Sequence, residues 1–272
     1  MNRYRPERLD ARVYRDFAVK SLSRLGPLSE EDVTSLFQAL NVIETWPQGQ
    51  ELIGEGAAQG QPRILLEGWA LRQRDLAGGR RQIFGFILPG DVFGLSARPD
   101  RIVMCSIVAA TAATSCQLPF LGRAMREETG ALHELVWHMI AREEACLLDQ
   151  VVRLGRQSAH ERMLHLLLEL HARLKEVGKT DGAGFHLPLS QEVLSDALGL
   201  SVVHTNRTLQ QLRREHLIQT HGSHLILSDP ERMAEIARYR PSRFEPPQPA
   251  AQASVNVPSC SSTDTVTSNP SA

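Results

Sequence analysis

The sequence has few cysteines, and they form no pattern that would hold a metal ion. Only four occur among 272 residues, and none forms a CxxC pair or lies at zinc-ligand spacing beside histidines. The four are Cys105, Cys116, Cys146 and Cys260. In a reducing compartment such thiols are most simply buried apolar residues. We therefore expect no metal and no cofactor, and we keep redox sensing by Cys105 or Cys116 as an alternative.

Long apolar runs are also absent. No stretch of about 18 apolar residues occurs, which argues against a membrane-spanning helix. The N-terminus MNRYRPERLD lacks the apolar core of a signal peptide. These absences predict a cytoplasmic protein with no membrane partner.

The chain shows neither an excess of one charge nor a catalytic motif. Its formal net charge is −1, so charge alone gives no support for a nucleic-acid partner. The P-loop, the GxSxG nucleophile motif and the HExxH zinc motif are all missing. We therefore predict no catalytic residues and a protein that is not an enzyme.

A helix-turn-helix pattern lies between Leu187 and Asp229. Ser190 suits the start of a first helix, and Gly199 suits its end, where a residue that tolerates positive φ is favoured. Ser201 suits the start of a second helix with an apolar stripe at helical spacing. That stripe consists of Thr205, Leu209 and Leu212. Two short helices joined by a turn that contains glycine can enter the major groove of DNA.

The opposite side of these helices carries the residues that we expect to contact DNA. Val203, Asn206 and Arg207 should face bases. The remaining candidates are Ser190, Gln191, Ser201, Val202, His204, Thr208, Gln210, His221 and Ser223. Short runs on either side of Gly222 predict a two-stranded wing. The alternative from this pattern alone is a small helical bundle with a solvated face.

Short, punctuated apolar runs between about 41 and 118 predict a β-sandwich or barrel. Strand-like runs recur at intervals of roughly ten residues without intervening helices. Turn residues occupy 77–79 and 89–91. Arg80 and Arg81, at the first turn, are expected to be exposed and solvated.

Residues 130–154 predict a long helix whose apolar stripe is wide enough for two partners. The stripe comprises Leu132, Leu135, Val136, Met139, Ile140, Leu147, Leu148, Val151 and Val152. One side can cover the β block and the other a second copy of the helix, although packing within one chain remains the alternative. Gly155 is the expected hinge, followed by a second amphipathic helix over 156–177.

Two segments near the C-terminal end have the composition of loops or tails. Residues 175–184 are polar and contain glycine, which predicts a loop. Beyond Pro241, proline, serine, threonine and alanine dominate, which predicts a disordered tail.

These residues resemble the Crp/Fnr family of bacterial transcription regulators. LSQEVLSDALGLS followed by VVHTNRTLQQLRREHLI is similar to its DNA-binding pattern. Gly68-Trp69-Ala70, the run GRRQI and Leu88-Pro89-Gly90-Asp91 are similar to its β domain in one branch. The resemblance covers about residues 15–240.

The resemblance implies an α+β protein with four parts. An N-terminal double-stranded β-helix (jelly-roll-like, cyclic-nucleotide-binding-like) sensor domain would span 1–129 and a dimerisation helix 130–155. A winged helix-turn-helix domain would span 156–240, and a disordered tail 241–272. It implies a sequence-specific regulator that binds palindromic double-stranded DNA as a homodimer, with RNA polymerase as a further candidate partner.

The resemblance also bears on individual site residues. Arg207 stands where the family reads a guanine. Val203 stands where a base-contacting Glu is frequent, and Val202 where polar residues are frequent, so the base preference should differ; a valine could pack against a thymine methyl group. The iron–sulfur cluster that some members hold on N-terminal cysteines is not supported, because no cysteine precedes Cys105.

The family's cyclic-nucleotide pocket would involve Phe93, Gly94, Leu95 and Ser106. Leu95 replaces the Glu that accepts from the ribose, and Ser106 lies near the position of the phosphate-binding Arg. The sequence therefore predicts either a different, unknown effector or a domain without a ligand. The competing function is a small-molecule or redox sensor whose helical domain contacts a protein instead of DNA.

Overall fold

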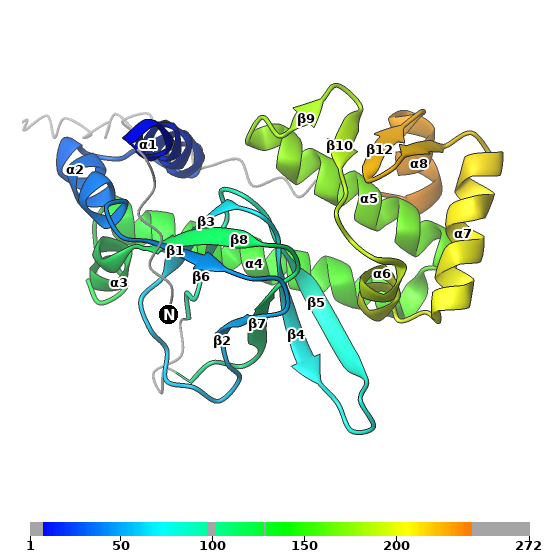
Figure 1. The fold of residues 1–272 in the computed structure, drawn as a ribbon, viewed down its shortest axis with the longest axis horizontal. Coiled ribbons are helices and arrows are strands. Elements are labelled where there is room, and N and C mark those ends of the chain that lie inside the picture. The colour runs from blue at the N-terminus through cyan, green and yellow to red at the C-terminus, as the bar shows by residue number, and fades with distance from the viewer. Residues whose placement is uncertain (1–7, 97–101, 128, 241–272) are drawn as a thin grey trace, which may run out of the picture.

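The computed structural model describes residues 8–96, 102–127 and 129–240, so the predicted tail over 241–272 lies outside the described residues. Within this range the β block forms two four-stranded antiparallel sheets (Figure 1). The first contains, in order, β1 (Ile43–Trp46), β8 (Ala113–Gln117), β3 (Arg63–Glu67) and β6 (Val92–Phe93). The second contains β2 (Glu51–Ile53), β7 (Ser106–Ala109), β4 (Ala70–Asp75) and β5 (Arg81–Ile87).

Apolar side chains from both sheets form the core of this block. Leu65 and Phe93 come from the first sheet and Ile107 from the second, and all three are buried in one cluster. Burial of such side chains is the main favourable term in folding. The predicted β domain is confirmed.

Three helices pack beside the sheets and close one end of the β block. They are α1 (Arg8–Ser23), α2 (Glu30–Ala39) and α3 (Pro119–Ala124). The start of α2 is set locally, because the Ser29 hydroxyl accepts from the Asp32 N–H and the Asp32 carboxylate accepts from the Ser29 N–H. Leu22, Leu36 and Phe120 join these helices in a second apolar cluster.

The long helix α4 (Ala131–Arg156) runs past the β block towards the C-terminal half (Figure 1). The predicted hinge at Gly155 is wrong in position, because Gly155 lies inside α4 and the extended residue that breaks the chain is Gln157 (φ −96°, ψ 145°). The break follows from the next helix, α5 (Ala159–Glu176). Its capping box between Ser158 and Glu161 requires an extended entry just before it.

The C-terminal half packs three helices and a sheet around α5. The helices are α6 (Gln191–Leu198), α7 (Val202–Arg214) and α8 (Pro230–Ala237). The sheet has the order β11 (Ile218–His221), β12 (His224–Leu227), β10 (Gly184–His186) and β9 (Thr180–Asp181).

The prediction of a loop over 175–184 and of a two-stranded wing is wrong in extent. Strands β9 and β10 form a hairpin, and β10 pairs with β12 through Phe185 and Leu225. Both side chains are buried, which explains why the segment is held in the sheet. Strands of two and three residues are too short to show alternation in the sequence.

The turn of the helix-turn-helix has the predicted geometry. The hydroxyls of Ser190 and Ser201 accept from the N–H groups of Val193 and His204. Gly199 is left-handed, with φ 63° and ψ 37°, and ends α6.

Replacing Gly199 with Ala is expected to lower the free energy of unfolding by about 1–2 kcal/mol, because left-handed backbone is costly for L-residues. The added Cβ would also lie 3.2 Å from Leu154 Cδ2. The matched control is Gly155→Ala, since Gly155 is helical and a Cβ there meets nothing within 4 Å. That control should raise stability by about 0.5–1 kcal/mol. Urea unfolding of both variants measures the contrast, and equal effects would contradict it.

Two ion pairs join the β block to the C-terminal half. Arg173 of α5 donates to Asp91, 2.6 Å away, and to the Phe86 carbonyl at 2.8 Å. Arg81 of β5 donates to Asp196 of α6 at 2.6 Å. The prediction of a solvated Arg80–Arg81 pair is therefore wrong for Arg81, because the β4–β5 hairpin projects alongside α6 (Figure 1). Arg80 is exposed.

Candidate nucleic-acid interface

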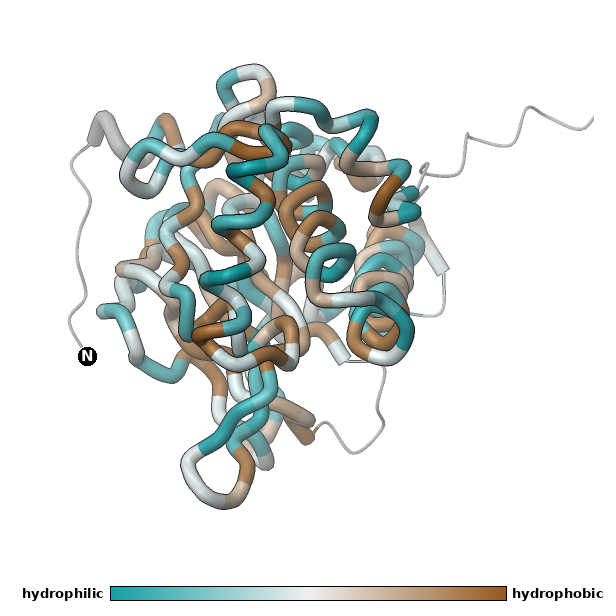
Figure 2. Tube along the Cα trace, turned by 90° about the vertical axis from the view of Figure 1, so that its right-hand side faces the viewer, coloured by the Kyte–Doolittle hydropathy of each residue, from teal (hydrophilic) through white to brown (hydrophobic). Residues whose placement is uncertain are grey.

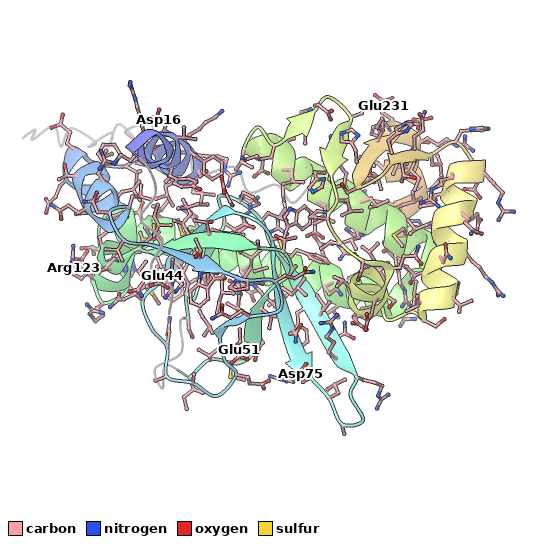
Figure 3. All side chains as sticks on the ribbon, in the orientation of Figure 1. Asp16, Glu44, Glu51, Asp75, Arg123 and Glu231 are labelled. Carbon is pink, nitrogen blue, oxygen red and sulfur yellow. The ribbon has the colours of Figure 1, made fainter. Side chains whose placement is uncertain are left out.

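Helix α7 lies at an edge of the molecule and is covered on one side only (Figure 1). Its inner side is Thr205, Leu209 and Leu212, which are buried as the sequence predicts. The side chains on its outer side project away from the body of the protein, and several end in nitrogen (Figure 3). A helix held in this way presents a continuous side-chain surface to a groove.

Most of the predicted DNA-contacting residues lie on this outer surface, towards which Figure 2 looks. The exposed members from α7 and its cap are Ser201, Val202, Val203, His204, Arg207 and Gln210. Asn206 is half-buried. No hydrogen bond or ion pair ties Arg207 to another described residue, so its guanidinium is available to an outside partner.

Thr208 does not belong to this surface, which corrects the prediction. Its side chain is 3% exposed, and its hydroxyl donates to the His204 carbonyl at 2.9 Å. Thr208 lies three residues after the buried Thr205, so helical spacing places it on the inner side. The polar residue type suggested a surface position that the periodicity contradicts.

The charge of α7 differs from that of the whole chain. The helix carries Arg207, Arg213 and Arg214 and no acidic residue, whereas the chain has a formal net charge of −1. Arg213 and Arg214 were not among the predicted contacts, although their position in the last turn is visible in the sequence. The Arg213 Nε–H donates to the Thr220 hydroxyl at 3.0 Å, which ties α7 to β11.

The wing and the start of α6 flank this surface. His221 and Ser223 are exposed on either side of Gly222, which has φ 61° at the β11–β12 turn. The Ser223 hydroxyl lies 3.0 Å from His186 Nδ1. Ser190 and Gln191 are exposed at the N-terminal end of α6, where unpaired helical N–H groups favour negative charge.

A pocket of about 210 Å³ lies in the β block near the predicted effector site. Gly94 and Leu95 line it, but Phe93 and Ser106 do not. Phe93 is buried in the core between the sheets. The Ser106 hydroxyl donates to Glu51, which is labelled on β2 in Figure 3, and accepts from the Glu55 N–H. Two of the four predicted residues therefore line this pocket and two do not.

The pocket lining does not suit a cyclic phosphate. Among the residues that the structure describes, the lining is largely apolar, with Ile53, Leu95 and Ile107 among its members, and Arg72 is the one cation. That guanidinium is already paired with Glu143 at 2.5 Å. A buried phosphate needs a cation or several donors that are not otherwise used.

Burial affects the reactivity of the three described cysteines. It raises the pKa of Cys116 to about 12 and also raises the pKa values of Cys105 and Cys146. These groups are therefore thiols rather than thiolates near neutral pH, and thiolates are the reactive form. Cys260 lies outside the described residues.

The described residues contain neither a metal-binding cluster nor a membrane-spanning helix. Across 8–96, 102–127 and 129–240, no three His, Cys, Asp or Glu side chains are placed to share a metal ion. In the same part of the chain, no helix combines the length and the apolar character needed to cross a membrane.

Comparison with known proteins identifies the family. Residues 161–236, from the start of α5 to α8, match the model of the Crp-like helix-turn-helix domain. The transcriptional activatory protein AadR of Rhodopseudomonas palustris is 31% identical over 225 residues, which cover 81% of this chain and 91% of AadR. The chain belongs to the Crp/Fnr family. It is a DNA-binding transcription regulator, as the sequence resemblance predicts.

Other members of the Crp/Fnr family support the same assignment. The nitrogen fixation regulation protein FixK of Bradyrhizobium diazoefficiens is 36% identical over 177 residues, 64% of this chain and 72% of FixK. The structure of FixK2 from Bradyrhizobium japonicum matches with a TM-score of 0.65 and 27% identity, over 72% of this chain and 96% of that one. The α+β fold, with an N-terminal β domain and a C-terminal winged helix-turn-helix, is therefore confirmed for this Crp/Fnr regulator.

Proposed function

We propose that this regulator binds a palindromic site in double-stranded DNA as a homodimer and places α7 of each protomer in the major groove. The observation that carries the proposal is the exposed face of α7, which has three arginines and no acidic residue and which no element of the described residues covers. Phosphate contacts from such cations supply most non-specific affinity, and base contacts add specificity.

Helix α4 supports the homodimer. The first half of its apolar stripe, including Leu135 and Met139, is buried within the chain. In its second half Leu148 and Val151 are 60% and 67% exposed, and Leu147 and Val152 are exposed beside them. Adjacent exposed apolar residues on a helix favour a partner, and a second α4 related by a two-fold axis offers the same surface.

Individual roles follow from position on the interface. Arg207 would donate to a guanine, Asn206 to a base edge, and Val203 would pack against a thymine methyl group. Contacts that set the register would come from Ser190, Gln191, Ser201, Val202, His204, Gln210, His221 and Ser223. Arg213 and Arg214 would add phosphate contacts at the end of α7.

Replacing Arg207 with Ala is expected to cost about 1–3 kcal/mol of specific binding and to relax preference at one base pair. Arg214→Ala is the matched variant on the same helix. It should weaken binding to all sequences alike and reduce the slope of log affinity against log salt concentration by about one. Binding titrations on matched and single-base-changed duplexes, at several salt concentrations, measure both effects. If Arg207→Ala kept the full sequence preference, the assigned base-reading face would be wrong.

Selection of duplexes from a random pool by the purified full-length protein tests the proposal directly. We expect recovery of an inverted repeat whose half-site centres lie about 10 bp apart, as a two-fold dimer requires. Selection should be repeated with cyclic AMP, which we expect to leave the result unchanged. Recovery of no common sequence under either condition would contradict the proposal.

We propose that the β-block pocket, if it takes an effector, takes a small and largely apolar molecule and not a cyclic nucleotide. Its apolar lining and the pairing of Arg72 with Glu143 support this. We further propose that the regulator acts in the cytoplasm, where its DNA lies. We also propose that it acts by binding DNA and not by catalysis, and that RNA polymerase is a partner. Redox sensing is less well supported, because the described cysteines are thiols near neutral pH.

A further inference from the structure

A second, smaller cavity lies where the β block, α4 and α5 meet. Its volume is about 70 Å³. The charged groups in its lining are Arg24, Arg72, Arg142, Arg153, Arg173, Asp91, Glu143 and Glu169. The ion pair between Arg72 and Glu143 also lines the β-block pocket and therefore stands between the two cavities.

Among the residues that the structure describes, the carboxylates paired with the guanidinium groups of this cavity are one fewer than those groups. Arg173 pairs with Asp91 at 2.6 Å, and Arg153 pairs with Glu169. Arg24 and Arg142 share a single oxygen of Glu176, at 2.6 and 2.7 Å. With the Arg72–Glu143 pair, five guanidinium groups therefore face four carboxylates.

The thiol of Cys146, which also lines the cavity, does not supply the missing negative charge. Burial raises its pKa, so the group stays neutral near neutral pH. Burial lowers the pKa of Arg24, and repulsion by Arg142 adds to this effect.

Several donors at the cavity also lack an acceptor. The buried Nε–H groups of Arg24, Arg153 and Arg173 have no hydrogen-bond partner in the described part of the chain. The Arg153 side chain is only 4% exposed, so bulk water does not satisfy it. Unsatisfied buried donors are costly, most of all on charged groups.

We propose that this cavity binds one small oxyanion, such as phosphate, sulfate or a short carboxylate. An oxyanion would supply the missing negative charge and several acceptors at once, and guanidinium groups match its geometry. A volume of about 70 Å³ exceeds the roughly 10–15 Å³ that one water requires. It is far below the roughly 300 Å³ of ordinary ligand pockets, which excludes a nucleotide.

The cavity is lined by residues from several parts of the regulator. Arg24 follows α1, Arg142 and Arg153 belong to α4, and Arg173 belongs to α5 of the DNA-binding half. A bound anion should therefore stabilise the packing of the DNA-binding half against the β block. Any ligand that binds the folded state alone raises its stability in proportion to the logarithm of concentration.

The test is calorimetric titration and thermal unfolding of the full-length protein with inorganic phosphate, at ionic strength held constant with chloride. We expect saturable phosphate binding and a rise in Tm that chloride does not produce. Parallel titrations with sulfate and acetate distinguish a tetrahedral anion from a carboxylate. Binding should weaken at least about tenfold in Arg142→Gln, which removes a lining guanidinium.

Arg156→Gln is the matched control, because Arg156 is an exposed arginine of the same helix outside the lining and should leave phosphate binding unchanged. If circular dichroism shows that Arg142→Gln does not fold, Arg24→Gln takes its place with the same expectation. No saturable response in the unmodified protein, or equal binding by the folded lining variant and the control, would overturn the proposal.

Discussion

Replacing Val151 with Asp is expected to convert the regulator into a monomer and to weaken specific DNA binding strongly. Val151 is 67% exposed in one chain, so the substitution should leave the fold of that chain intact. In a homodimer formed through α4 the new carboxylate would be buried beside apolar residues without a counter-charge, which costs several kcal/mol.

The loss of DNA binding follows from symmetry. Two recognition helices on one two-fold dimer contact two half-sites at once, and a monomer contacts only one. We therefore expect affinity for the palindromic site to fall on the order of 100-fold or more, because the second half-site becomes a separate binding event. Sedimentation equilibrium reports the oligomeric state, and titration with the selected duplex reports the affinity.

Val42→Asp is the matched control for this experiment. Val42 is 57% exposed and apolar, but it lies beside β1 and away from α4. The control should remain dimeric and bind DNA normally. A dimeric, DNA-binding Val151→Asp variant would show that the exposed half of α4 is not the interface.

Replacing Asp91 with Asn is expected to cost about 3 kcal/mol of stability, because it leaves the guanidinium of Arg173 short of counter-charge at the domain junction. The two side chains are 20% and 13% exposed, which favours the lower end of the range for buried pairs. Asn keeps the size of the side chain and can still accept from the Leu88 N–H. In thermal unfolding this loss corresponds to roughly 6–12 °C.

Asp196→Asn is the matched control, because it breaks the other ion pair between the β block and the C-terminal half. Asp196 and Arg81 are 25% and 28% exposed and so more solvated. This variant should cost about 1 kcal/mol or less. Equal losses in the two variants would show that burial does not decide the strength of these contacts.

The same pair predicts a dependence of stability on pH. Burial disfavours the charged form of Asp91, but Arg173 and the Leu88 N–H outweigh it and hold the pKa of this carboxyl below its usual range. Its contribution is then complete above the unfolded pKa of about 4 and is lost as pH falls through the lower folded value. The free energy of unfolding of Asp91→Asn should consequently fall less with decreasing pH than that of the unmodified protein.

Prediction from sequence succeeded where neighbouring residues decide the structure. Ser190, Gly199 and Ser201 act on backbone groups within a few positions of themselves, so their caps and turn could be inferred directly. The inward stripe of α7 follows from helical spacing in the same way. The prediction that Thr208 lies on the outer surface was wrong, because it followed the polar residue type and not the helical spacing.

Prediction failed where the partner is distant in the chain. Arg81 lies 115 residues from Asp196 and Arg173 lies 82 residues from Asp91, and no local pattern links either pair. The four residues predicted for the effector site are divided for a similar reason, since only two of them line the pocket. Gly94 and Leu95 could be placed beside the pocket by resemblance, whereas the Ser106 side chain donates to Glu51 on another strand.

The sequence by itself determined the order of the elements, the helix-turn-helix and its polar outer face, because these depend on periodicity and on short-range caps. Only the tertiary structure decided which charges meet at the domain junction, which half of α4 stays exposed, and that five guanidinium groups surround a small cavity there. Such contacts depend on how whole elements pack in space, and packing brings together residues that the chain itself keeps far apart.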